Sequence, residues 1–199
     1  MKVLDQKVLL GLRERIQRQN TMDPTDNPVT NSDVWGSTAA FAIIGILLLL
    51  PLLFLYPEAD FMQSPRAMIA ASGIFWGLLS VIAFRAFWDL YYQHFYPSWV
   101  RPLAPLNIFL YAVFGLIMWF LANSVNTLPV LVFIFLGGIE GLLEHFIGVY
   151  GLRVLEKVPV FNTLDAGPVL IFSFFEYIVY WSIVAWLAVA LTKLVPQWL

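Results

Sequence analysis

Five long apolar segments, separated by prolines and short polar stretches, dominate the sequence from residue 35 onward. As a helix, each is long enough to cross the roughly 30 Å of a membrane's hydrocarbon layer. Backbone polar groups inside lipid must be satisfied within the segment, so each segment is expected to be helical. The predicted helices lie at residues 35–56, 67–92, 104–123, 129–150 and 166–193.

The composition supports a membrane protein over a soluble one. Hydrophobic residues make up 60% of the 199 residues and charged residues 12%, whereas soluble domains average about 45–50% and about 25%. The formal net charge of −2 excludes a basic, nucleic-acid-binding surface. Because the loops are short, residues 34–199 are expected to form one all-α, polytopic bundle of five transmembrane helices.

The first 33 residues are predicted to form a separate cytoplasmic region. Leu4, Val8, Leu12 and Ile16 recur at helical spacing, which is typical of an amphipathic helix on a membrane surface. A solvated helix that docks on a partner is the alternative. Residues 19–33 are polar and rich in turn-forming residues, which predicts a linker.

Lysine and arginine at the helix ends predict the orientation, since cytoplasmic loops carry more of them. On the side of the N-terminus these residues are Lys2, Lys7, Arg13, Arg15, Arg18, Arg101, Arg153 and Lys157. The opposite side has only Arg66 and Lys193. We therefore expect a multi-pass protein of the cell (plasma or inner) membrane, with its N-terminus in the cytoplasm and its C-terminus outside.

Several ionisable residues fall inside the predicted helices, where charge is costly and commonly functional. The stretch GGIEGLLEHFIGVYG, residues 137–151, contains three of them. Apart from Lys193 at the outer end of the fifth helix, the ionisable residues are Arg85, Asp89, Glu140, Glu144, His145 and Glu176. All lie in the predicted cytoplasmic halves or near the midplane. Four ionised carboxylates and one arginine would leave a charge of about −3, which protons, bound cations or water must offset.

Helical spacing predicts that these groups share one cavity. Gly137, Gly141, Glu144, Gly148 and Gly151 form a stripe on the fourth helix, and small residues of this kind let helices pack closely. Asn107 aligns with Tyr111 on the third helix, and Glu176 aligns with Tyr180 on the fifth. The predicted cavity lies inside the bundle and opens to the cytoplasm.

A metal ion is one occupant that such a cavity suits. Carboxylates with imidazole are ligands for Fe, Mn or Zn, and helical bundles hold di-metal sites in this manner. The Glu-x-x-His motif of those sites is absent, because position 142 is Leu. The predicted ligands are Glu140, Glu144, His145, Glu176 and Asp89. The residues predicted to hydrogen-bond to these ligands or to balance their charge are Arg85, His94, Asn107, Tyr177 and Tyr180.

The leading hypothesis is a membrane protein that binds a divalent metal, as a metalloenzyme acting on a lipophilic substrate or as a divalent-cation carrier. No reaction follows from the pattern, so no catalytic residue is assigned, and haem is not expected. The alternative is a non-catalytic subunit of a larger membrane complex, with the acids used for assembly or proton transfer. The lipid bilayer is the expected surrounding, and a membrane-protein partner or a second copy of the chain fits this alternative.

Overall fold

The computed structural model of the chain describes residues 30–56, 63–89, 92–125, 128–155, 158 and 166–194. Within these ranges five helices are long and apolar enough to cross a membrane, and none of the described residues is in a strand. The predicted all-α membrane bundle is therefore confirmed. The predicted amphipathic helix, in the first 29 residues, lies outside the described part.

The long helices are α2 (Asn31–Leu55), α3 (Pro65–Val81), α5 (Asn107–Ser124), α6 (Pro129–Phe146) and α7 (Ala166–Leu194). The shorter elements are η2 (Ile82–Ala86), η3 (Tyr92–His94), α4 (Val100–Leu103), η4 (Ala104–Leu106) and η5 (Ile147–Gly151). The π-helical turns η2 and η5 continue α3 and α6, whereas α4 and η4 lead directly into α5.

The second predicted span, 67–92, is wrong at its C-terminal end. The helix becomes π-helical at Ile82, and Phe87 then leaves helical geometry with φ −108° and ψ 7°. Turn hydrogen bonds replace the helical ladder, because the Gln93 amide donates to the Trp88 carbonyl at 3.0 Å. Phe87 and Trp88 are apolar and therefore extend the predicted helix, yet with Asp89 they form a turn.

Side chains at two helix starts explain where those helices begin. Thr30 caps α2 in a capping box: its Oγ1 accepts from the Asp33 amide at 3.3 Å, and Asp33 Oδ2 accepts from the Thr30 amide at 2.8 Å. Ser64 caps α3 by accepting from the Ala67 amide at 3.2 Å. Pro65 follows at the first helical position, where a missing N–H costs no helical hydrogen bond.

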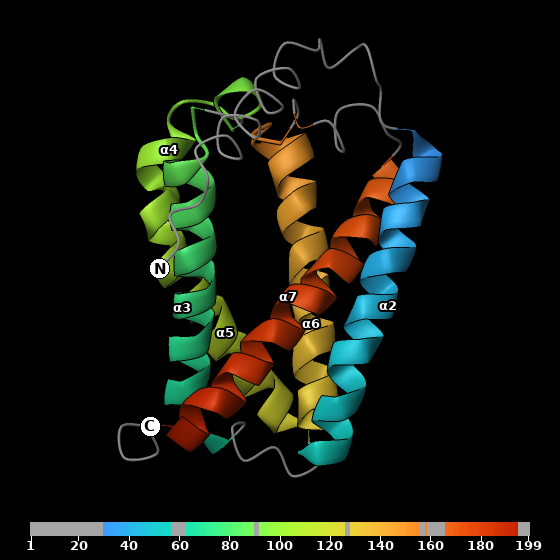
Figure 1. The fold of residues 1–199 in the computed structure, drawn as a ribbon, viewed down its shortest axis with the longest axis vertical. Helices are drawn as coiled ribbons and strands as arrows, with labels where there is room; N and C mark the ends of the chain where they lie inside the picture. Colours follow the sequence, from blue (N-terminus) through green and yellow to red (C-terminus); the bar gives the residue numbers. More distant parts are fainter. Residues whose placement is uncertain are drawn as a thin grey trace, which may run out of the picture.

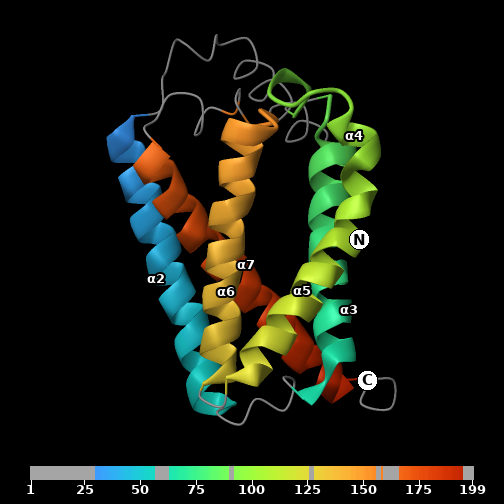
Figure 2. The same cartoon turned by 180° about the vertical axis from the view of Figure 1, so that it is seen from behind.

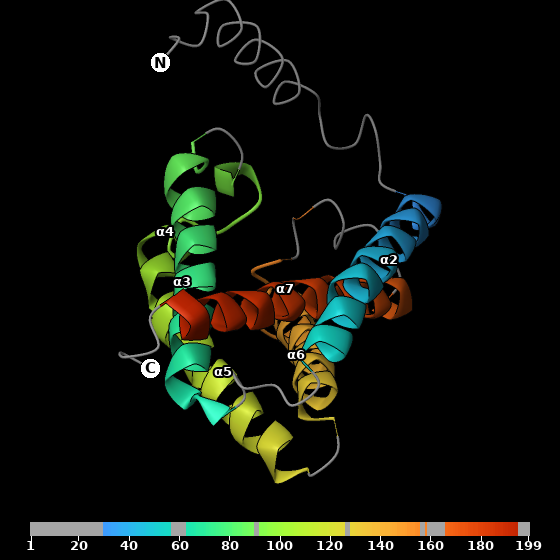
Figure 3. The same cartoon turned by 60° about the horizontal axis from the view of Figure 1, so that its bottom comes forward.

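Helix α7 is the central element of the bundle. It crosses the other helices diagonally (Figure 1) and contacts α2, α3 and α6. Helix α5 packs on α3 and slants across to approach α6 at the end where α6 begins (Figure 2). When the bottom of the bundle is turned toward the viewer, α7 runs between α3 on one side and α2 on the other (Figure 3).

Glycines on α6 permit the close contact with α7. Gly137, Gly138 and Gly141 are buried, and a methyl group at any of them would overlap an α7 side chain. Close helix approach through small residues is the usual packing device in membranes, where apolar burial gives little driving force. The predicted stripe is correct for Gly137 and Gly141. Gly151 is exposed and does not take part in this contact.

Candidate functional site

A cavity of about 900 Å³ lies among α3, α5, α6 and α7, and the turns around η3, α4 and η5 border it. Most of its wall is aromatic or aliphatic. Its ionisable carboxyl and imidazole groups are Glu140, Glu144 and His145 from α6 and Glu176 from α7. No lysine or arginine of the described chain lines it. The predicted inward cavity is thus present, with acidic groups on the α6–α7 side and apolar groups elsewhere.

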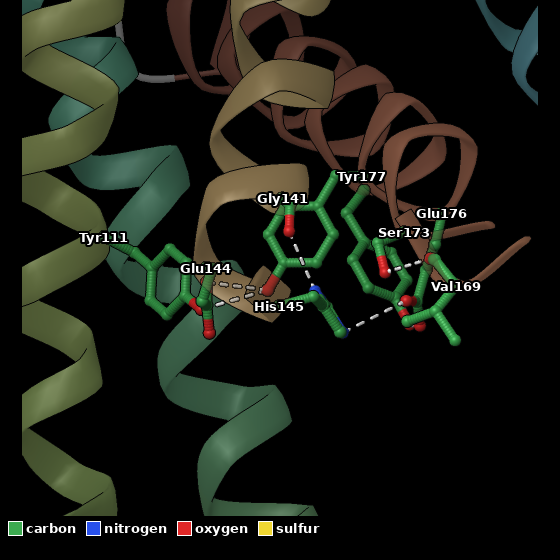
Figure 4. Close-up of polar contacts among 9 residues, drawn as sticks. Tyr111, Gly141, Glu144, His145, Val169, Ser173, Glu176 and Tyr177 are labelled. Carbon is green, nitrogen blue, oxygen red and sulfur yellow. Dashed lines mark hydrogen bonds and ion pairs between the residues drawn. The ribbon is translucent and has the colours of Figure 1, made fainter. Parts of the chain in front are cut away.

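Glu144 is the centre of a hydrogen-bond network that joins three helices. Its Oε2 accepts from the hydroxyl of Tyr177 at 2.7 Å and from the hydroxyl of Tyr111 (Figure 4). The two hydroxyl oxygens are 3.2 Å apart. Tyr111 belongs to α5 and Tyr177 to α7, and both side chains are buried. One carboxyl group therefore holds α5, α6 and α7 together.

The His145 ring is oriented by a hydrogen bond at one nitrogen, and its other nitrogen faces Glu176. Nδ1 lies 2.9 Å from the Gly141 carbonyl oxygen, so Nδ1 must carry the hydrogen in this bond. Nε2 faces Glu176 Oε2 at 3.7 Å. The other oxygen of Glu176 accepts from the Tyr180 hydroxyl at 2.7 Å. The hydrogen bond to Gly141 orients the imidazole so that its second nitrogen faces the Glu176 carboxyl group.

Glu140 is only partly satisfied. Its Oε2 accepts from the indole Nε1 of Trp181 at 3.2 Å, whereas Oε1 is buried without a hydrogen bond. Two other buried side-chain atoms of the described residues share that condition: Trp76 Nε1 and Glu176 Oε2. All three residues line the cavity. Native proteins pair almost all such atoms, so their concentration in one cavity indicates a ligand-binding position.

The structure does not bring every predicted site residue to the cavity. The Asp89 side chain is 76% exposed and lies 3.5 Å from Arg101, beyond the end of η2. Arg85 and His94 are exposed as well and are not among the lining residues. Asp89 lies apart from the cavity because the helix ends before it, whereas Arg85 lies on an exposed side of η2. Asn107 does line the cavity and donates to Ser80 at 3.2 Å.

Two tryptophans of the site were not predicted. Trp76 stacks on Tyr111, with ring centroids 3.8 Å apart and planes at 14°, and Trp181 is completely buried. From sequence alone, a tryptophan in an apolar helix is interpreted as an ordinary core residue or as a lipid-facing one. The role of the Trp181 indole N–H becomes visible only from its acceptor, the Glu140 carboxyl group on another helix. Sequence spacing within one helix does not predict that acceptor.

The metal-binding hypothesis gains no support from this geometry. Among the described residues, no three His, Asp or Glu side chains converge as a metal-binding group. Glu144 Oε2 accepts from two tyrosines, and His145 Nδ1 is bonded to the Gly141 carbonyl. The hypothesis that Glu140, Glu144, His145 and Glu176 hold Fe, Mn or Zn stays a prediction.

The position of the imidazole hydrogen gives a test of this site. We expect ¹⁵N NMR to show Nδ1 of His145 protonated, and to show the Nε2 resonance shift when Glu176→Gln changes the group opposite it. The chain has two histidines, so the His94→Gln variant assigns the signals. A His145 with hydrogen on Nε2 alone would contradict the described contact with Gly141.

Comparison with protein-family models, with curated proteins and with solved structures found no match to this chain.

Proposed function

We propose that this chain is an integral membrane protein that binds a lipophilic molecule in the cavity. The polar head of the ligand lies near Glu140 and Glu176, and its apolar body lies against α5 and α6. The observation that supports this most is the wall itself: a mostly apolar cavity of about 900 Å³ with its carboxyl groups gathered on one side. That volume is in the range of about 300–1,000 Å³ typical of small-molecule sites.

The wall is continuous with the outer face of the bundle. Leu110 and Ile117 of α5, Leu143 of α6 and Ile147 of η5 all line the cavity, and each is between 46% and 52% exposed. In a membrane such exposed apolar side chains face lipid. A lipophilic ligand therefore has a route from the bilayer between α5 and α6, without crossing a polar barrier.

The experiment is photolabelling in lipid nanodiscs with hexadecanol that carries a diazirine in its chain. We expect labelled peptides to come mainly from α5 and α6 around Leu110 and Leu143. The Leu110→Trp variant should reduce this labelling several-fold, because the larger ring occupies the cavity. The matched variant Leu116→Trp alters an exposed α5 residue outside the cavity, and should leave labelling unchanged.

Helix α2 serves as an internal reference for labelling from the lipid phase. Ile43 and Leu47 are 58% and 65% exposed and do not line the cavity. Labelling of α5 and α6 no stronger than that of α2, and unaffected by Leu110→Trp, would refute the proposed binding site.

A divalent metal is the competing occupant. Elemental analysis of the purified protein beside the double variant Glu140→Gln/Glu144→Gln separates the two hypotheses. About one equivalent of Fe, Mn or Zn in the wild type that disappears in the variant would favour the metal. The predicted cytoplasmic N-terminus and the role as a subunit of a larger complex remain predictions beside this proposal.

A further inference from the structure

We propose that the polar head of the ligand is a hydroxyl group, so that the site selects a long-chain or isoprenoid-type alcohol. The group is recognised between Trp76 Nε1 and Glu140 Oε1. This inference rests on the proposed lipophile-binding function and specifies its substrate class.

Trp76 and Glu140 both line the cavity and are linked through shared neighbours. The Trp76 ring centroid lies 6.3 Å from that of Trp181, and Trp181 donates to Glu140 Oε2 at 3.2 Å. On its other side Trp76 stacks on Tyr111, which bonds to Glu144, one helical turn from Glu140. A buried donor and a buried oxygen, both without hydrogen bonds, are thus held by one set of aromatic rings.

The indole N–H of Trp76 requires an acceptor. The residue is 4% exposed and lines the cavity, and no described residue supplies that acceptor. An indole nitrogen only donates. A buried donor left unsatisfied costs about 1–3 kcal/mol, so a ligand oxygen at this position is favoured over a hydrocarbon.

Glu140 Oε1 further limits which ligand head groups fit the site. If the carboxyl group is ionised, Oε1 needs a donor; if it is protonated, Oε1 can itself donate. A ligand hydroxyl fits both cases, because it can donate to Oε1 while accepting from Trp76, or accept from both groups. A ketone or ester oxygen fits only the protonated case. An ammonium group would leave Trp76 without an acceptor.

Anionic heads are disfavoured by the rest of the wall. A carboxylate or phosphate head would lie near Glu140, Glu144 and Glu176, and none of the described lining residues is a lysine or arginine. Such a head would find no cationic partner there, and like charge would repel it wherever these carboxyl groups are ionised. Fatty acids and phospholipid head groups are therefore expected to bind poorly, whereas a neutral alcohol has no charge to offset.

The test is competition against the photoreactive hexadecanol by unlabelled compounds with the same chain: hexadecanol, hexadecylamine, palmitate and hexadecane. We expect hexadecanol to compete about tenfold better than hexadecane and better than either charged compound. The variants Trp76→Phe and Glu140→Leu should each reduce the alcohol's advantage about threefold to tenfold, as expected for one lost hydrogen bond. Competition by hexadecane should be the same in these variants as in the wild-type protein.

The control is Trp35→Phe, which alters a half-exposed indole on α2 away from the cavity and should keep the alcohol's advantage. Cavity labelling with equal competition by all four compounds would overturn the hydroxyl assignment while the proposed function stands. Stronger competition by hexadecylamine would also overturn it, in favour of a cationic ligand. Failure to label the cavity at all would refute the proposed function itself.

Discussion

Replacing Gly141 with alanine is expected to destabilise the bundle strongly. An added methyl group would overlap the root of the Tyr177 side chain, with Tyr177 Cβ at 2.5 Å, and these atoms have no freedom to move without shifting α7. Overpacking typically costs about 1–3 kcal/mol, and we expect the upper end here. The thermal midpoint of the purified protein, followed by tryptophan fluorescence, measures the loss.

Two other glycines provide controls for this substitution. At Gly138 the methyl group would meet the ring edge of Phe174 at 2.6 Å and the tip of Ile178 at 3.0 Å, which are outer atoms that can rotate away. We expect Gly138→Ala to cost clearly less. At Gly36, on α2, nothing lies within 4 Å, so alanine should stabilise the helix by up to about 1 kcal/mol. Equal losses at Gly141 and Gly138 would contradict the described α6–α7 packing.

Replacing Glu144 with alanine is the second change with a large expected effect. The substitution removes the acceptor of two buried tyrosine hydroxyls. One hydroxyl can still donate to the other across their 3.2 Å separation, so one donor remains unsatisfied, at about 1–3 kcal/mol. With the lost side-chain packing, we expect a total of about 2–4 kcal/mol, measured by unfolding in mixed detergent.

Glu144→Gln is the matched control, because it keeps one acceptor oxygen and nearly the same shape. Its cost should be less than half that of Glu144→Ala. A double-mutant cycle with Tyr177→Phe should give a coupling energy of about 0.5–3 kcal/mol, as contacting residues do. A Glu144→Ala variant as stable as wild type would mean that this carboxyl group does not join the three helices.

Helix positions followed well from the sequence because a membrane demands about 20 apolar residues per crossing. Helix α7, predicted at 166–193, spans Ala166–Leu194. The failure at Asp89 has the same origin. Phe87 and Trp88 extend the hydropathy signal past the point where η2 ends, and that extension placed the exposed Asp89 inside the predicted span.

The sequence predicts only those features of the site that depend on spacing within one helix. Glu140, Glu144 and His145 share α6, and their inward facing follows from the glycines beside them. The partners of these groups depend on how α7 crosses α6. Nothing within one helix indicates that Trp181 meets Glu140 or that Tyr177 meets Glu144, since each pair is separated by more than 30 residues in the chain.

The order of α6 and α7 along the chain has a consequence for biosynthesis. Glu140 and Glu144 reach the membrane with α6, whereas their donors Trp181 and Tyr177 arrive later, with α7. Until α7 is inserted, α6 is a nascent helix with two acids that lack these partners, which makes it a poor occupant of lipid. We therefore expect α6 to be stably inserted only once α7 follows it, so damage to α7 should also lower the amount of α6 in the membrane.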